Sequence, residues 1–332
     1  ARAVFIMDKA MHKIGLHGKS FIPLLMGFGC NVPAILSTRI IESRRDRLIT
    51  MLINPFMSCS ARLPVYILFI TAFFRSYQGT ILFGIYFIGV LLAIGSALIF
   101  RKTIFRKKDV PFVMELPPYR VPTMRSIVRH MWHRTGQYLQ KIGGIILISS
   151  IVIWALGYFP VHFEEKQHIE IQLSALKSAN IEINKSAIYP QQAKDSLNAE
   201  YAAKTSELEF AISVAQQKNS FIGRIGHFIE PALRPLGFDW KMSVALLTGV
   251  SAKEVVVGTL GVLYQTDDQG KGSKPLVEKL QNQYFTSGPK QGQPVFTPLV
   301  ALSFMLFILI YFPCIGVVSA ISRESGHWKW AL

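Results

Sequence analysis

Hydrophobic residues along the chain gather in long runs separated by polar stretches. Six runs approach the length of about 20 residues that a membrane helix needs: 20–38, 48–74, 79–100, 142–161, 242–266 and 294–322. Buried core helices of a soluble protein would account for one or two such runs, but not for six. The pattern therefore predicts an all-α polytopic membrane protein.

The composition agrees with this class. Of the 332 residues, 50% are hydrophobic and 17% are charged, and the formal net charge is +16. A soluble chain carries nearer to a quarter charged residues. Three cysteines are too few for a disulfide scaffold, and the hydrophobic content excludes a disordered chain.

Clusters of Lys and Arg indicate the membrane sides. Because short basic loops stay in the cytoplasm, we expect 39–47 and 101–141 to lie inside. Within the second cluster, 125–141 mixes cations with apolar residues, which predicts an amphipathic helix in the interface. A nucleic-acid surface is the alternative for these charges, but clusters adjoining apolar runs are more simply membrane anchors. The stretch 162–220 has no Arg and predicts an extracytoplasmic helical insert, whereas 267–293 is expected to be an inside loop.

Helix breakers interrupt the first, second and last runs: Pro23, Gly27, Gly29, Pro33, Pro55, Pro64 and Pro313. Broken helices are tolerated in a bilayer only where protein or a wet cavity covers the freed backbone groups. The breaks thus predict a pathway, with bent helices of no special role as the alternative.

The chain also resembles itself weakly. Residues 1–5 are similar to 252–256, and Cys30 and Cys314 each lie near a proline and are followed nine positions later by an Arg. The expected topology takes 20–38 inward and 294–322 outward. Similar units of opposite orientation indicate an inverted-repeat transporter with its site at mid-membrane, where broken helices meet.

All three cysteines, Cys30, Cys59 and Cys314, lie beside these breaks. Thiolates are soft ligands that suit Fe, Cu(I) and Zn, so a metal pathway and simple apolar packing are both open. Asn31, Met57 and Ser58 are candidate auxiliary ligands.

Charged residues also occur inside the runs, at Arg62, Lys253 and Glu254, and each needs a partner or a cavity. They are candidate gate charges, and structural pairing explains them equally well. No catalytic constellation is found.

The motifs around these residues resemble the membrane part of the FeoB family, ferrous iron transport protein B. The matching stretches are 15–35, 54–66, 116–120, 246–257 and 313–332. The resemblance implies two gate repeats and uptake of Fe²⁺ across the bacterial inner membrane, with Cys30, Cys59 and Cys314 along the path. It also implies a GTP- and Mg²⁺-binding G domain before residue 1, so this fragment itself is not expected to be an enzyme. Small cytoplasmic partner proteins of the same operon are typical of the family. The resemblance leaves open whether the protein forms a homo-oligomer.

This reading divides the chain into four parts. Residues 1–78 form a first gate repeat, incomplete at its N-terminus, and 79–161 form membrane helices around the cytoplasmic basic segment 101–141. Residues 162–220 form the periplasmic insert, and 221–332 form a second gate repeat, incomplete at its C-terminus. The rival functions are a transporter of nucleosides or another organic solute, and a membrane scaffold whose breaks are only structural.

Overall fold

The structure, a computed structural model, describes residues 2–105, 123–160, 164–185, 191–264, 276–284 and 292–331. Helices make up its regular structure, and the described residues contain no β-strand, only one isolated bridge between Tyr284 and Pro294. The expected all-α class is thereby confirmed. Residues 106–122, within the basic segment 101–141, lie outside the described residues.

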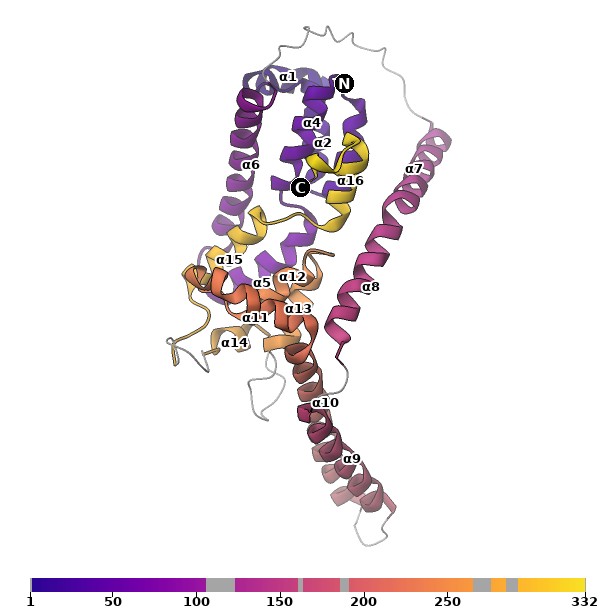
Figure 1. Ribbon diagram of the computed structural model, residues 1–332, viewed down its shortest axis with the longest axis vertical. Coiled ribbons are helices and arrows are strands. Elements are labelled where there is room, and N and C mark those ends of the chain that lie inside the picture. The colour runs from indigo at the N-terminus through magenta and orange to yellow at the C-terminus, as the bar shows by residue number, and fades with distance from the viewer. Residues whose placement is uncertain are drawn as a thin grey trace.

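The first unit consists of five helices, and a sixth packs along it (Figure 1). These are α1 (Arg2–Ile14), α2 (Phe21–Gly27), α3 (Asn31–Ser37), α4 (Arg44–Ile53), α5 (Leu63–Phe73) and α6 (Gln78–Thr103). Helices α2 and α3 pack against each other as a hairpin whose tip is 28–30. Lys19 precedes α2 and Glu42 follows α3, yet their side chains form an ion pair of 2.8 Å. Both ends of this first hairpin therefore lie on the same side.

A broken helix follows the first hairpin. Helices α4 and α5 are separated by two 3₁₀ turns, Asn54–Phe56 and Ser60–Arg62, with an extended stretch at 57–59 between them. Pro55 and Pro64 each lie in the first turn of a helical segment at the break, where the missing N–H costs no helical hydrogen bond. We call 57–59 the first break.

The second unit repeats this order. Its helices are α11 (Phe221–Leu233), α12 (Trp240–Thr248), α13 (Val255–Tyr264), α14 (Leu276–Gln281), α15 (Pro298–Ile310) and α16 (Ile315–Ser325). Helices α12 and α13 form the second hairpin, with its tip at 249–254. Its two ends are joined where the Tyr264 hydroxyl donates to Asp239 Oδ1 over 2.6 Å. Helices α15 and α16 form the second broken helix, and 311–314 is the second break.

Several residues of the two units correspond. The same number of positions separates Gly15 from Gly237, which both have positive φ, and Gly27 from Gly249, which both lie at the C-terminal end of the first helix of a hairpin. The two breaks also match each other, Cys59 with Cys314, since each cysteine directly precedes the second half of a broken helix. Cys30, at the first tip, corresponds to Ala252.

The units are inverted with respect to each other. The first hairpin opens at the end where α6 finishes, because Gly15 lies against the Arg101 side chain. The second opens at the opposite end, where α13 and α14 pack against α5 and Gln281 donates to the Ala72 carbonyl. Figure 1 shows the two hairpins at opposite ends of the bundle.

This arrangement corrects four expectations. The runs 20–38 and 242–266 do not cross the bundle, because each folds back as a hairpin. The run 294–322 proceeds toward the end that carries Arg39, since Arg39 pairs with Glu324, so its expected direction was wrong. The described part of 267–293 accordingly lies at the end opposite 39–47. The similarity of 1–5 to 252–256 was a false register, because α1 is the counterpart of α11.

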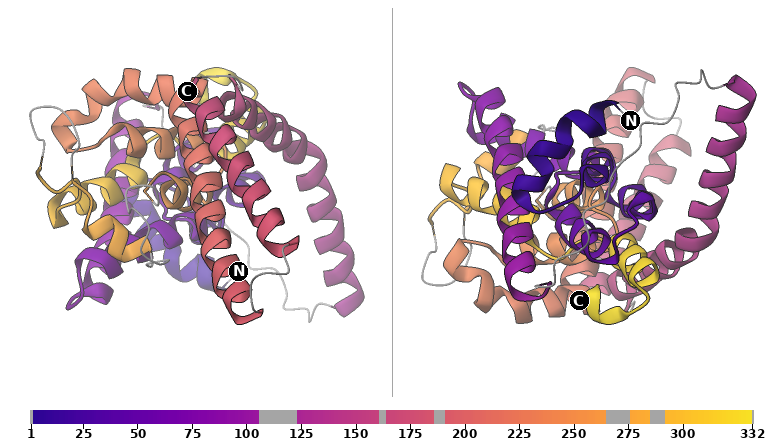
Figure 2. Two further views of the ribbon diagram at one scale, coloured as in Figure 1. Left: turned by 90° about the horizontal axis from the view of Figure 1, so that it is seen from below. Right: turned by 90° about the horizontal axis from the view of Figure 1, so that it is seen from above.

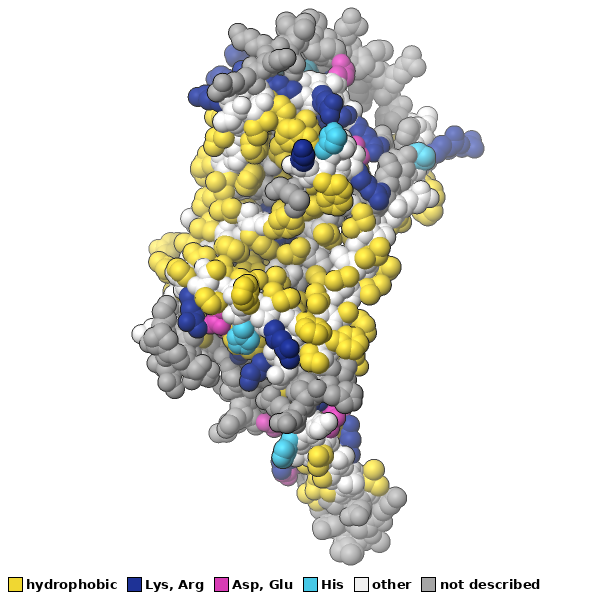
Figure 3. Space-filling view, viewed as in Figure 1, with side chains coloured by type: hydrophobic (Ala, Val, Ile, Leu, Met, Phe, Trp, Pro, Cys, Tyr) yellow, Lys and Arg dark blue, Asp and Glu magenta, His cyan; other side chains and the backbone are white. Residues whose placement is uncertain are grey.

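Among the residues that the structure describes, three helices are long and apolar enough to cross a membrane: Arg44–Phe73, Gln78–Thr103 and Pro298–Ser325. They overlap most of the expected runs 48–74, 79–100 and 294–322. Hydrophobic side chains cover the middle of the visible face, and Lys and Arg gather toward the ends (Figure 3). This distribution fits a molecule whose middle faces lipid.

The segment between α6 and α11 lies at the rim of the bundle, where its helix α8 packs against α11 and α16. Helix α7 (Met124–Tyr138) continues through a π-helical turn, Leu139–Gly143, into α8 (Gly144–Tyr158). The expected amphipathic helix thus forms, but as the extension of an apolar helix at the rim of the molecule (Figure 2). Helices α9 (Glu164–Lys185) and α10 (Gln191–Asn219) then form a projecting hairpin, in which Lys177 and Glu209 pair at 2.8 Å.

Candidate functional site

A cavity of about 140 Å³ lies where both hairpin tips and both breaks meet. All three cysteines line it, although they come from distant parts of the sequence. The other lining residues are Asn31, Val32, Ala61, Arg62, Ile146, Ser251, Ala252, Lys253, Glu254, Pro313, Gly316 and Val317. Every principal candidate of the sequence analysis, both thiol and gate charge, therefore borders one space.

Each cysteine reaches the cavity because it begins a helical segment. Cys30 precedes α3, Cys59 precedes the turn that leads into α5, and Cys314 precedes α16. All three have extended backbone, and none of their side chains caps its helix. The cysteines are free: Cys30 is exposed, Cys314 is half-buried and Cys59 is buried.

Hydrogen bonds hold the first tip against the first break. The Ser60 amide donates to the Gly29 carbonyl over 3.1 Å, and the Asn31 side-chain amide donates to the Asn54 carbonyl over 3.2 Å. Gly27 allows this approach, since a Cβ there would lie 2.3 Å from Asn54 Oδ1. The first hairpin is therefore fixed to its own broken helix.

The second unit repeats the arrangement with different side chains. The Ile315 amide donates to the Val250 carbonyl over 2.8 Å, and Lys253 Nζ donates to the Phe312 carbonyl over 2.9 Å. Lys253 Nζ also lies 3.2 Å from the centroid of the Tyr311 ring, within cation–π distance. In both units, the residue after the break cysteine donates to a carbonyl of the hairpin tip, and a side chain at or beside the tip donates back to a carbonyl of the broken helix.

The gate charges differ in their surroundings. Arg62 is 1% exposed, and its guanidinium donates to the Pro55 carbonyl over 3.0 Å and to the Met57 carbonyl over 3.3 Å. Lys253 is 3% exposed, whereas its neighbour Glu254 is exposed. The two adjacent side chains thus differ in burial, although both lie in the turn that precedes α13.

Of the three auxiliary candidates, the structure places only Asn31 among the described lining residues. Ser58 is instead within 3.4 Å of the Tyr66 hydroxyl, and Met57 contributes its carbonyl to Arg62. Sequence reasoning missed Tyr311, because one aromatic residue within an apolar run carries no signal. The described residues contain no group of three or more His, Cys, Asp or Glu arranged to hold a metal ion. The thiols thus border a shared space without forming a closed site.

An ion pair links the two units at the far ends of α3 and α16. The Arg39 guanidinium donates to both carboxylate oxygens of Glu324, one bond being 2.8 Å. Bidentate pairs of this kind fix geometry as well as charge. The hydrogen bond to Glu324 raises the pKa of Arg39, so its charge is held at every working pH.

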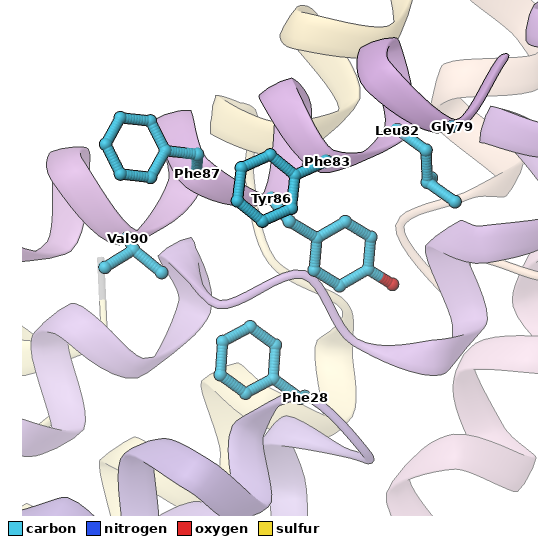
Figure 4. A pocket seen from close by; sticks show the side chains of 7 residues that line it. All are labelled: Phe28, Gly79, Leu82, Phe83, Tyr86, Phe87 and Val90. Atoms are coloured by element: carbon cyan, nitrogen blue, oxygen red, sulfur yellow. The ribbon is translucent and has the colours of Figure 1, made fainter.

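A larger hollow of about 480 Å³ lies elsewhere, between α6 and the first tip (Figure 4). Its walls are apolar, with Phe28, Phe83, Phe87 and Val90 among them, and the Tyr86 hydroxyl is the polar group at its edge. The apolar walls of this hollow provide no suitable ligands for a metal ion. The candidate site is therefore the smaller cavity that contains the cysteines.

Two inverted units, each with a hairpin and a broken helix, define a membrane-transporter domain of the gate type. The family profile described as Gate, nucleoside recognition, matches residues 1–73 and 139–328. The profile described as ferrous iron transport protein B C terminus matches 82–134. The chain belongs to the FeoB family.

Curated relatives are similar to this chain over nearly its full length. It is 53% identical over 334 residues to the Fe(2+) transport protein A/Fe(2+) transporter FeoB fusion protein of Porphyromonas gingivalis, covering 100% of this chain and 37% of that protein. It is 37% identical to the Fe(2+) transporter FeoB of Helicobacter pylori, with coverages of 99% and 48%, and 38% identical to that of Methanocaldococcus jannaschii, with 100% and 41%. The chain thus spans less than half the length of these relatives. No solved structure matches it.

Proposed function

We propose that this chain is the membrane part of a ferrous iron transporter, and that Fe²⁺ passes inward through the cavity between the two units. The observation that carries the proposal is the convergence of Cys30, Cys59 and Cys314 on one cavity at both breaks. Thiolates favour Fe²⁺ over Mg²⁺ or Ca²⁺. The relatives are named as Fe(2+) transporters, which supports the same cargo.

The size of the cavity argues against an organic solute. Pockets for small organic molecules usually enclose about 300–1,000 Å³, whereas this one is about 140 Å³. A nucleoside would therefore need a much wider opening than the one present. A single ion with part of its hydration shell needs far less space.

The proposed ion meets the three thiols in turn rather than together. Conduction requires that binding be favourable enough for entry and weak enough for release. A cavity whose cysteines do not form a closed site satisfies that requirement. Asn31, also on the cavity wall, supplies an auxiliary oxygen, while Arg62, Lys253 and Glu254 set the charge that the ion encounters.

The remaining parts of the proposal concern the whole protein. GTP and Mg²⁺ bind in a G domain N-terminal to this chain, which gates or drives transport, and this chain itself performs no catalysis. A small cytoplasmic partner acts with it, in keeping with the relative whose name joins transport protein A to FeoB. The protein resides in the bacterial inner membrane, with the α9–α10 hairpin on the periplasmic side.

Uptake of radiolabelled Fe²⁺ by full-length protein in proteoliposomes under reducing conditions tests the proposal. Each of the variants Cys30→Ser, Cys59→Ser and Cys314→Ser should lower uptake by about tenfold or more, by analogy with the loss of a ligand-supporting group. Met51→Leu is the matched control, because Met51 is 0% exposed and lies in the apolar core beside α3 and α16. Wild-type uptake by all three folded serine variants would refute the path. Uptake of labelled uridine in place of Fe²⁺ would support the organic-solute alternative.

A further inference from the structure

The two broken helices differ at one buried position. Asn54 lies in the turn before the first break, and its counterpart in the second unit is Leu309, at the separation that relates Cys59 to Cys314. Asn54 is 0% exposed and Leu309 is 1% exposed. Leu309 packs in an apolar cluster, whereas neither amide atom of the Asn54 side chain has a hydrogen-bond partner among the described residues. The first broken helix thus contains an unpaired polar group where the second is apolar.

The first hairpin covers this group. A Cβ at Gly27 would lie 2.3 Å from Asn54 Oδ1, so the end of α2 closes directly over the amide. The tip that follows is held beside Cys59, because the amide and the hydroxyl of Ser60 donate to the Gly29 carbonyl over 3.1 and 2.7 Å. An unpaired buried amide costs free energy, and water that enters as the hairpin lifts would pair with it. Opening of the first hairpin therefore relieves a cost that the second unit does not have.

The apolar hollow beside α6 gives the first tip a space to move into (Figure 4). Phe28, at the tip, lines the hollow and stacks on Tyr86 with ring centroids 6.0 Å apart. Phe83 and Phe87, on the same wall as Tyr86, are exposed, so in a bilayer the hollow is open to lipid chains. Lipid chains are as apolar as the side chain that would displace them, so their displacement costs little.

The opposite end of the first hairpin is fixed. The ion pair of Lys19 with Glu42 joins its two ends, and Arg39 binds Glu324 of α16. Between the ion pairs and the tip, α3 contacts α16 through aliphatic side chains, which form no directional bonds. A hairpin that is fixed at one end and packed against an apolar surface can pivot about that end.

We propose that the first hairpin is the moving gate. It pivots about its fixed end, carries Phe28 into the hollow, and uncovers Asn54 and Cys59. The second hairpin stays on its own break, where Lys253 donates to the Phe312 carbonyl from a buried position. The role of this motion in iron transport rests on the proposed function. The motion itself does not, because it can be measured without iron.

The first test measures how fast N-ethylmaleimide labels Cys59 in iron-free full-length protein, read by peptide mass spectrometry. Gly79 lines the hollow, and a Cβ there would meet no atom within 4 Å, so Gly79→Trp fills the hollow without a clash. This variant should label Cys59 about tenfold more slowly, because the tip has lost the space it moves into. Gly95→Trp is the matched control, since Gly95 lies on α6 outside the hollow and is equally free of neighbours. It should label at the wild-type rate.

The second test replaces Asn54 by the residue of the second unit. Asn54→Leu keeps the size of the side chain and removes the unpaired amide, which stabilises the closed hairpin. The midpoint of thermal unfolding should rise by about 2–6 °C, while Cys59 labelling and Fe²⁺ uptake should fall about tenfold. A merely structural role would not raise stability and lower uptake together. The reverse exchange, Leu309→Asn, buries a new unpaired amide and should lower the midpoint.

Three results would overturn the inference. They are a midpoint of Asn54→Leu at or below that of the wild type, a raised midpoint with unchanged uptake, and Cys59 labelling that Gly79→Trp leaves at the wild-type rate. If Gly79→Trp cannot be purified, Gly79→Phe takes its place. A wild type that transports no Fe²⁺ would refute the proposed function instead, and the labelling of Cys59 would still decide whether the hairpin moves.

Discussion

Gly249 directly follows α12, the first helix of the second hairpin, and the second break leaves no room for a side chain at this position. A Cβ at this position would lie 2.5 Å from Val256 Cγ2 and 2.6 Å from the Tyr311 hydroxyl. Real contacts of a Cβ are not this short, so Gly249→Ala must push the tip away from the broken helix. Overpacking of this kind costs about 1–3 kcal/mol.

Gly258 supplies the matched comparison, because it lies in the same hairpin, within α13. A Cβ there would meet no atom within 4 Å, so Gly258→Ala gains helix propensity without a clash. The expected gain is about 0.5–1 kcal/mol. The two substitutions are chemically identical and should change the free energy of unfolding in opposite directions.

Thermal unfolding of the purified full-length protein, followed by intrinsic fluorescence, measures the difference. At about 2–4 °C for each kcal/mol, Gly249→Ala should lower the midpoint by several degrees and Gly258→Ala should raise it slightly. Equal midpoints for the two variants would show that the tip and the break are not in contact as described. The reasoning about the second unit would then fail.

Two further predictions concern charge pairs. Arg39→Ala and Glu324→Gln should each destabilise the protein slightly, and a double-mutant cycle should give a coupling of about 0.5–1 kcal/mol; additive effects would show that the link between α3 and α16 is absent. In the projecting hairpin, the hydrogen bond from Lys204 lowers the pKa of Glu200. The stabilisation by this pair is therefore present above the ordinary pKa of Glu and is lost as the pH falls through the lowered value. Carboxyl NMR should find a low pKa for Glu200 that returns to normal in Lys204→Gln.

The sequence was sufficient to predict the class of protein and to single out several residues that border the cavity. Long apolar runs required membrane helices, and proline and glycine within them required breaks. Cysteines at those breaks, and charges in otherwise apolar runs, identified the residues that the structure brings to one cavity. These signals are local, because helix propensity and the cost of buried charge depend on neighbouring residues.

The folding back of 20–38 and 242–266 could not be read from the sequence. An apolar run of about 20 residues has the length of one membrane crossing, and two short helices with a glycine-rich tip have the same composition. What distinguishes them is contact between their ends, such as the ion pair of Lys19 with Glu42, which joins residues far apart in the sequence. The false register of the internal repeat has the same origin. An isolated cysteine looks the same in the sequence whether it belongs to a hairpin tip or to a broken helix.

The contact of α3 with α16 has a different character from the contacts inside each unit. Each tip is joined to its own broken helix by hydrogen bonds, whereas α3 and α16 meet through aliphatic side chains such as Val32, Ile35, Val317 and Ile321. Aliphatic surfaces can slide past one another without giving up directional bonds. Any motion of one unit against the other that exposes the cysteines alternately to the two membrane faces should therefore slide along this aliphatic contact. The ion pair of Arg39 with Glu324 would be the fixed point of that motion.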